Sequence, residues 1–158
     1  MLNTKEFRDA LGCFATGVCV VTTTLEDGTA IGMTINSFSS VSLEPALVLW
    51  SIQLSSECYE TFNQCDKFAI NILSAPQQSL SNLYAKKGGH LLETGQFTLG
   101  SSGSPLLEDV MATFECRTWA KYPGGDHTII IGEVDNFVVG DTSSPLLFYK
   151  GKYGQLSE

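Results

Sequence analysis

The sequence predicts a mainly β protein, an antiparallel β-barrel with a few inserted and flanking α-helices. Its 158 residues fit one domain (1–158) of ordinary size, long enough to bury a single core. Six or seven β-branched and apolar runs are spaced along the chain, and helical patterns fall only in the first half. Because strands and helices do not alternate throughout, a doubly wound parallel sheet is disfavoured.

The first half combines strands with three helical segments. The opening helix is predicted over residues 3–14, with Asn3 as its cap and one apolar face made of Phe7, Ala10, Leu11 and Phe14. Gly17 is a plausible break after it. Strands are then predicted over residues 18–24, 30–35, 46–52 and 67–73. An Asp-Gly turn joins the first two strands, and a polar, serine-rich connection occupies residues 36–43.

Two further helices are expected, one between the strands at 46–52 and 67–73 and one after the strand at 67–73. Ser55 or Ser56 caps the first of them, and the second covers residues 76–86 with Leu80, Leu83 and Tyr84 facing inward. The glycine-rich stretch 88–104 is read as loop, with at most a short element near Phe97. Strands follow at 113–121, 127–139 and 145–150, and in the first of these Glu115, Arg117 and Trp119 are expected to face outward.

The charge of the chain excludes one class of partner. The net charge is −8 at pH 7, and only nine lysines and arginines are spread over the whole sequence. Nucleic acid is bound chiefly through such cations, so no nucleic-acid binding is expected. An anionic ligand would have to be held by local backbone N–H groups, hydroxyls and one or two placed cations.

The composition points to a covered surface. Apolar residues make up 43% and charged residues only 16% of the chain, against about a quarter charged in an average soluble domain. A domain this small cannot bury all of that apolar area internally, so a partner subunit is expected to cover part of it.

The cysteines and the first residues indicate the compartment. The five cysteines are odd in number and lack CxxC spacing, which disfavours both a disulfide framework and a metal site. They are interpreted mainly as small buried hydrophobes. Neither an apolar leader nor an apolar run of about 20 residues is present, so no membrane segment is predicted. We expect a reduced, cytoplasmic protein.

Two hydroxyl- and amide-rich segments, 34–40 and 51–56, each follow an apolar strand. They should lie at the same end of adjacent strands and converge on one pocket. The second segment leads into a helix start, where free N–H groups favour an anion, and Ser55 and Ser56 add hydroxyl donors. The alternative interpretation is an ordinary helix cap beside a polar loop.

Two basic side chains, Lys86 and His127, are candidates for a ligand contact. Lys86 follows a helix and could supply a cation, or it merely complements the negative end of that helix. His90 lies in a glycine-rich loop and is expected to be exposed. His127 enters an apolar strand from a turn, either as a structural residue or as a donor to a bound ring or phosphate. No nucleophile, phosphate-loop or Rossmann motif is present, which favours chemistry by a bound cofactor.

Five segments in order resemble the flavin reductase-like, FMN-binding split-barrel family. They are FATGV with VVTT (from residue 14), GMTINSFSSVSL with Pro45 (from 32), FAINILS (68–74), GDHT with GEV (from 125) and PLLFYKGKYG (145–154). The resemblance runs from about residue 7 to residue 153, which is nearly the whole chain.

This resemblance implies an antiparallel split barrel, a homodimer, and FMN or FAD bound near the subunit interface. The matched positions assign the flavin ring and ribityl side to Thr34, Ile35, Asn36 and Ser37. They assign the phosphate to Ser51, Gln53, Ser55, Ser56, Ala85 and Lys86. They place His127, the candidate catalytic residue, and Tyr153 toward the nicotinamide.

The resemblance therefore implies an NAD(P)H-dependent flavin reductase that passes a hydride from nicotinamide to flavin and supplies a partner monooxygenase. An FMN-binding electron-transfer protein of the flavoredoxin type, with tightly held flavin and a protein redox partner, is the alternative. A split-barrel module without activity is a third reading. The sequence leaves open FMN or FAD, NADH or NADPH, and bound or diffusible flavin.

Overall fold

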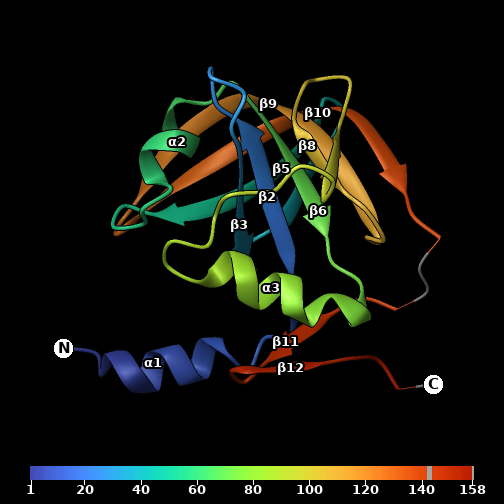
Figure 1. Ribbon diagram of the computed structural model, residues 1–158. Coiled ribbons are helices and arrows are strands. Elements are labelled where there is room, and N and C mark those ends of the chain that lie inside the picture. Colours follow the sequence, from blue (N-terminus) through green and yellow to red (C-terminus); the bar gives the residue numbers. More distant parts are fainter. Residues whose placement is uncertain (142–143, 158) are drawn as a thin grey trace.

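The computed structural model describes residues 1–141 and 144–157, and it confirms a mainly β, antiparallel architecture (Figure 1). Seven strands form one antiparallel sheet in the order β3-β2-β6-β9-β10-β5-β4. Their bounds are β2 (Cys19–Thr24), β3 (Ala30–Ile35), β4 (Ser39–Leu43), β5 (Ala46–Gln53), β6 (Lys67–Ile72), β9 (Ala112–Gly124) and β10 (His127–Val139). The predicted strands at 30–35 and 127–139 have the observed bounds.

A serine side chain links the two sides of this curved sheet. Ser37 follows β3, at one edge of the sheet, and Ser51 lies in β5, near the other edge. The Ser37 hydroxyl accepts a hydrogen bond from the Ser51 N–H at 3.0 Å and donates one to the Ser51 carbonyl at 3.2 Å. The loop after β3 is thereby held against β5, although the two strands are not neighbours in the sheet.

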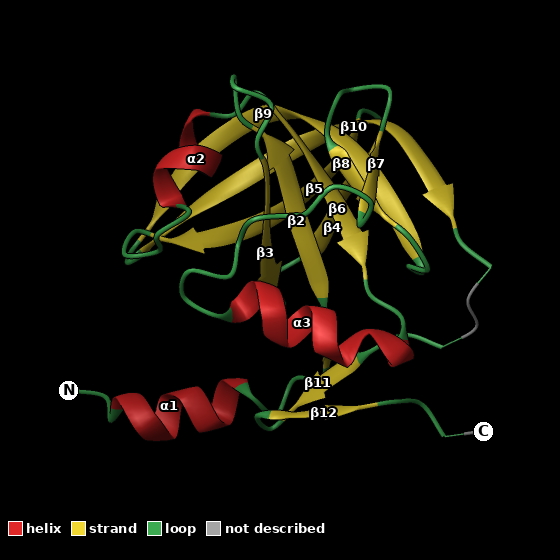
Figure 2. Cartoon of the chain, viewed as in Figure 1, coloured by secondary structure: helices red, strands yellow, loops and turns green. Residues whose placement is uncertain are grey.

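Helices and short strands surround the barrel, as Figure 2 shows. The helices are α1 (Thr4–Leu11), α2 (Tyr59–Gln64), the 3-10 turn η1 (Ala75–Gln77) and α3 (Gln78–Ala85). The short strands are β1 (Thr16–Gly17), β11 (Leu147–Tyr149) and β12 (Lys152–Gly154), which form one sheet, and β7 (Phe97–Leu99) and β8 (Pro105–Leu107), which form a hairpin. Helix α3 packs against β3, and α1, β11 and β12 lie beyond it at the bottom of Figure 1.

Two apolar clusters make the core. The first fills the barrel around Trp50, whose ring meets Phe62 and Phe68 edge-on at centroid distances of 5.2 and 5.9 Å. The second, which includes Val20, Leu73 and Tyr84, lies between the barrel and its surrounding elements. Among the described residues, no helix is long and apolar enough to cross a bilayer.

Three predictions about strands need correction. Residues 39–43, predicted as a connection, form edge strand β4, whose exposed, serine-rich sequence has the composition of a loop. The short strands β8 and β12 were not predicted; β8 follows the stretch 88–104 read as loop, and β12 follows the strand predicted over 145–150. Glu115, predicted to face outward, is only 2% exposed, because the loop before β8 folds over it and donates hydrogen bonds to it.

Two helical predictions are also corrected. Helix α2 begins at Tyr59 and has no side-chain cap; Ser56 instead accepts a hydrogen bond from the Cys58 N–H in the turn before it. In α3, Leu83 is 39% exposed and Ser81 is fully buried. The apolar spacing predicted that Leu83 would face inward, but the side of α3 toward β3 carries the small polar residue Ser81.

Candidate functional site

A pocket of about 200 Å³ lies between the end of β3, helix α3 and the β11–β12 hairpin. We call it the Tyr153 pocket; it is lined by Val18, Thr34, Ile35, Asn36, Ser81, Ala85, Phe148 and Tyr153. Five of the sequence-predicted site residues therefore meet here, from three parts of the chain that are far apart in sequence.

A second pocket, of about 510 Å³, lies on the other side of Thr34 and Ala85. We call it the His90 pocket; it is lined by Met33, Thr34, Gln53, Ser55, Ser56, Glu57, Tyr84, Ala85, Lys87 and His90. Because Thr34 and Ala85 line both pockets, the two share a wall. The prediction that segments 34–40 and 51–56 converge on one pocket is confirmed at Thr34, Gln53, Ser55 and Ser56.

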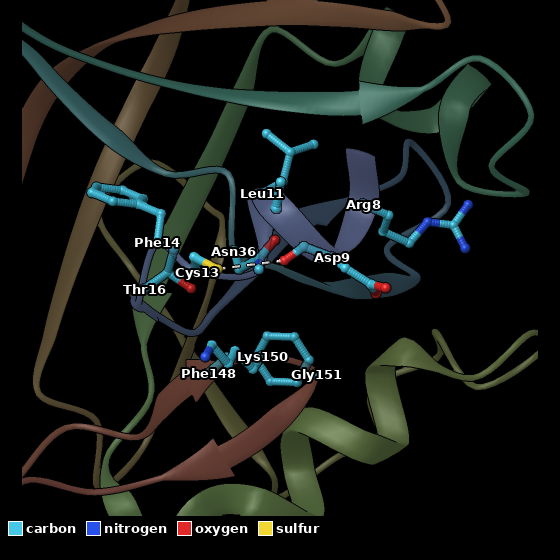
Figure 3. A pocket seen from close by; sticks show the side chains of 12 residues that line it. Arg8, Asp9, Leu11, Cys13, Phe14, Thr16, Asn36, Phe148, Lys150 and Gly151 are labelled. Atoms are coloured by element: carbon cyan, nitrogen blue, oxygen red, sulfur yellow. Dashed lines mark hydrogen bonds between the residues drawn. The ribbon is translucent and has the colours of Figure 1, made fainter. Parts of the chain in front are cut away.

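A third pocket of about 880 Å³ opens beside helix α1 and includes residues of β1 and β11 (Figure 3). Asn36 and Phe148 line both this α1 pocket and the Tyr153 pocket. Thr16 lines it too, and among the described residues the buried hydroxyl oxygen of Thr16 has no hydrogen-bond partner. Asn36 thus sits at the junction of two cavities.

Hydrogen bonds fix the polar wall of the Tyr153 pocket. The Thr34 hydroxyl donates to the Ser81 carbonyl at 2.7 Å, and the Ser81 hydroxyl lies 2.6 Å from the Tyr153 hydroxyl. The Tyr153 ring packs edge-on against Phe148 at 5.3 Å. Strand β3, helix α3 and strand β12 are thereby joined, and the Thr34 oxygen can still accept a further hydrogen bond.

The Asn36 side chain is the most available polar group at this wall. It is exposed, and within residues 1–141 and 144–157 its amide takes part in no hydrogen bond. An amide offers both donors and an acceptor, so it can meet the edge of a heterocyclic ring.

Two predicted residues act in the scaffold instead. Ser37 and Ser51 line none of the three pockets, and the Ser37 hydroxyl is already engaged with the Ser51 backbone. Their effect on a ligand would be to hold the loop that carries Asn36.

The basic side chains that line the His90 pocket do not include the predicted Lys86. Lys87 and His90 line the pocket, whereas Lys86 ends helix α3 and lines none of the three pockets. The expectation that His90 is exposed is wrong, because its side chain is only 13% exposed and its Nδ1 lies 3.0 Å from the Gly32 carbonyl oxygen. Its Nε2 lies 2.7 Å from a carboxylate oxygen of Glu57.

His127 stands apart from these pockets. It begins β10 opposite Gln53 of β5, and its Nδ1 lies 2.7 Å from Asp126 Oδ1. This hydrogen bond, together with the attraction to the ring, lowers the pKa of the Asp126 carboxyl. Gln53 lines the His90 pocket, so the register places His127 beside that pocket, although it is not one of the lining residues.

The buried cysteines are unsuited to nucleophilic chemistry. Burial raises the pKa of the Cys19 and Cys116 thiols to about 12, and burial with the nearby Glu57 raises that of Cys58 to about 11. These thiols stay protonated at neutral pH. No group of three or more potential metal ligands occurs within the described part of the chain.

Several lining residues escaped the sequence reasoning. Ser81 and Phe148 carried no separate signal, although Ser81 lies four residues before Ala85 and so shares its helix face. Tyr84 was predicted to face inward but not to line a site. The contact of Lys87 and Glu57 with the pocket was not predicted, because the path of the turn after α3 cannot be read from local spacing.

Comparison with known proteins gives the family. A model of the flavin reductase-like domain matches residues 11–157. The chain is 44% identical over 155 residues to an NADH-dependent FMN reductase of Agrobacterium fabrum, covering 98% of this chain and 87% of that one. It is 43% identical to the reductase component of a trigonelline monooxygenase of Acinetobacter baylyi, covering 94% of this chain but 48% of that longer protein.

Solved structures agree with this result. The fold matches that of the flavin reductase PheA2 with a TM-score of 0.88 and 41% identity, covering 99% of this chain and 100% of that one. It matches an NADH:FAD oxidoreductase of Streptomyces globisporus, solved with NAD and FAD fragments, with a TM-score of 0.91 and 32% identity over 99% of this chain and 96% of that one. The split-barrel fold, the matched residues and these identities together show that the chain belongs to the flavin reductase-like domain family.

Proposed function

We propose that this protein is an NAD(P)H-dependent flavin reductase that holds FMN in the Tyr153 and His90 pockets. The observation that carries the proposal is that these two pockets share Thr34 and Ala85, so that an elongated ligand can occupy both. The Tyr153 pocket is lined by rings, an amide and hydroxyls, and the His90 pocket by hydroxyls, two basic side chains and the Glu57 carboxylate. That gradient fits a flavin ring at one end and a phosphate at the other.

The residues of the Tyr153 pocket would orient the flavin ring. When bound, flavin supplies the hydride-accepting chemistry that no side chain of this pocket has. The Asn36 amide is unpaired and reaches the pocket, and the rigid Thr34–Ser81–Tyr153 wall limits how the ring can lie. Ile35 adds a buried apolar contact. The contribution of the protein is thus one of positioning, which can supply much of the rate of a transfer between two bound rings.

The His90 pocket would take the phosphate end. Ser55 and Ser56 bring hydroxyls, and Lys87 and His90 bring basic side chains. Such local groups are necessary because the chain as a whole carries a net charge of −8. Lys86 retains at most a peripheral role, since it does not line the pocket.

The co-substrate and the partners follow from the relatives. Relatives of this chain are named NADH-dependent FMN reductases and reductase components of two-component monooxygenases. We therefore propose NADH as the hydride donor and a monooxygenase as the consumer of reduced flavin. Free thiols at all five cysteines fit a cytoplasmic location.

A homodimer completes this proposal. Helix α1 has no buried residue, and Phe7, Leu11 and Phe14 are 51%, 59% and 80% exposed. An exposed apolar stripe of this kind is typical of a surface that a partner covers, and it adjoins the α1 pocket. A second copy of the chain seated there would also enclose Asn36, which lines the same pocket.

The test is the absorbance of the purified protein near 450 nm with FMN, followed by NADH addition without oxygen. Catalytic bleaching of added FMN supports the reductase. Yellow colour that co-purifies and persists with NADH supports instead an electron-transfer protein with a protein redox partner. A colourless protein that ignores both reagents contradicts the proposal.

A further inference from the structure

Glu57 places a negative charge among the groups of the His90 pocket that are suited to an anion. One Glu57 carboxylate oxygen lies 2.7 Å from His90 Nε2 and also accepts a hydrogen bond from the Gly88 backbone N–H. The side chains of His90 and Glu57 are 13% and 35% exposed, so water screens this ion pair only in part. Two donors that could face a ligand are therefore taken by a side chain of the protein itself.

His90 is held from both sides. Its Nδ1 faces the Gly32 carbonyl oxygen at 3.0 Å, while its Nε2 faces Glu57. Both partners are hydrogen-bond acceptors, so both ring nitrogens of His90 are already engaged within the protein. A phosphate that is to contact the Nε2 of His90 must take the place of the Glu57 carboxylate.

The Gly88 N–H is presented by a tight turn. Gly88 has a φ of +80°, and the Gly89 N–H donates to the Lys86 carbonyl oxygen at 3.0 Å, which closes a turn over residues 86–89. Lys87 lies in the same turn, lines the pocket and forms no ion pair within the described residues. A backbone N–H, an imidazole nitrogen and an ammonium make a donor set that a phosphate accepts readily.

We infer that Glu57 is an internal competitor of the flavin phosphate, and that it sets the affinity of this enzyme for FMN. The inference rests on the proposed function, which puts the phosphate in this pocket. Phosphate binding must displace the Glu57 carboxylate from His90 and Gly88 or accept its repulsion. Either cost weakens the binding of FMN relative to a pocket without this carboxylate.

The test is Glu57→Gln, which keeps the size of the side chain and removes its charge. Dissociation constants for FMN and for riboflavin, which has no phosphate, are measured by quenching of flavin fluorescence. FMN should bind at least about fivefold more tightly to the variant, the worth of one like-charge contact near 4 Å in water. Riboflavin should stay within about twofold of the wild type.

Glu26→Gln is the matched control. Glu26 is exposed at the turn between β2 and β3, lines none of the three site pockets, and its substitution changes the net charge by the same amount. Its FMN affinity should equal that of the wild type.

The outcomes separate the two claims. If the wild type binds flavin but Glu57→Gln binds FMN no more tightly, or tightens FMN and riboflavin equally, the role of Glu57 is overturned. If the wild type binds neither flavin, the proposed function itself fails and the inference fails with it.

Discussion

At the scale of single residues, the site combines a short chain of hydrogen bonds with one exposed amide beside it. Thr34, Ser81 and Tyr153 bond to each other across three elements, and Asn36 beside them is left without an internal partner. A wall whose polar groups bond to each other is already ordered, so binding a ligand costs little conformational entropy there. If flavin binds here as proposed, the Asn36 amide is the group available to recognise it.

His127 gives a prediction about rate. Asp126 holds its Nδ1, which leaves Nε2 for an incoming nucleotide. His127→Ala should slow NADH-dependent flavin reduction by about tenfold or more, the lower range for loss of an orienting or acid-base group. Flavin affinity should change little, because His127 lines none of the site pockets. Stopped-flow absorbance at 450 nm measures the rate, and an unchanged rate removes His127 from the reaction.

Glu115 gives a prediction about stability and pH. Burial acts to raise the pKa of its carboxyl, but hydrogen bonds from the Ser102 N–H, Asn136, and the Ser102 and Ser101 hydroxyls outweigh this, and the pKa is lowered. A lowered folded-state pKa stabilises the fold above the unfolded pKa of about 4.3, and this contribution is lost as the pH falls through the folded value.

The variant Glu115→Gln should therefore lose about 1–3 kcal/mol of unfolding free energy at pH 7, because it leaves buried donors poorly satisfied. The gap to the wild type should shrink at pH 3. Urea denaturation at both pH values measures it, with the exposed Glu26→Gln as control. An equal gap at pH 7 and pH 3 would show that the charge of Glu115 is not what stabilises the loop.

At the scale of elements, helix α1 stands out because none of its residues is buried. It is eight residues long, and helices this short are marginal in water without packing. None of its side chains is buried, and Figure 1 shows α1 outside the barrel, in the layer that also contains β11 and β12. Its stability must come from something that covers it, and a second copy of the chain is the proposed cover.

Phe14→Ser tests this cover. The ring is 80% exposed beside the α1 pocket, so replacing it should shift the sedimentation mass from dimer toward monomer and weaken FMN binding several-fold. Leu99→Ser, in the β7 hairpin and 60% exposed, is the matched control and should leave both unchanged. A wild type that sediments as a monomer contradicts the proposed dimer.

Elements with a strong pattern were predictable, and those defined by tertiary pairing were not. The segment 30–35, which follows a clear Asp-Gly turn, and the long apolar run 127–139 formed strands with the predicted bounds. Strand β4 has a serine-rich, exposed sequence, and only its pairing with β5 makes it a strand. Strand β12 is likewise defined by its partner β11 rather than by its own three residues.

The site was predicted in the same uneven way. Thr34, Asn36 and Tyr153 were expected from family resemblance, and the structure brings them to one pocket. Glu57, Lys87 and His90 meet only because the turn after α3 folds back over the end of β5, a long-range contact that no local spacing encodes. Ser37 was expected at the ligand from the family resemblance and its hydroxyl-rich segment; in the fold its hydroxyl bonds to the Ser51 backbone.

At the scale of the whole molecule, the pockets lie where the barrel meets the layer beneath it. The barrel supplies Thr34 and Asn36, α3 supplies Ala85, and the β11–β12 hairpin supplies Phe148 and Tyr153. Ala85, the exposed last residue of α3, lines both the Tyr153 pocket and the His90 pocket. A bulky side chain there should fill the shared wall without disturbing the core.

Ala85→Trp is therefore the most direct test of the central claim that one flavin occupies both pockets. The control is Asn82→Trp, on the same helix, exposed, and outside all three pockets. In an FMN titration followed by anaerobic NADH, the wild type and Asn82→Trp should bind FMN and bleach at 450 nm, while Ala85→Trp should do neither. If Ala85→Trp, folded by circular dichroism, binds and reduces FMN like the wild type, the flavin lies elsewhere.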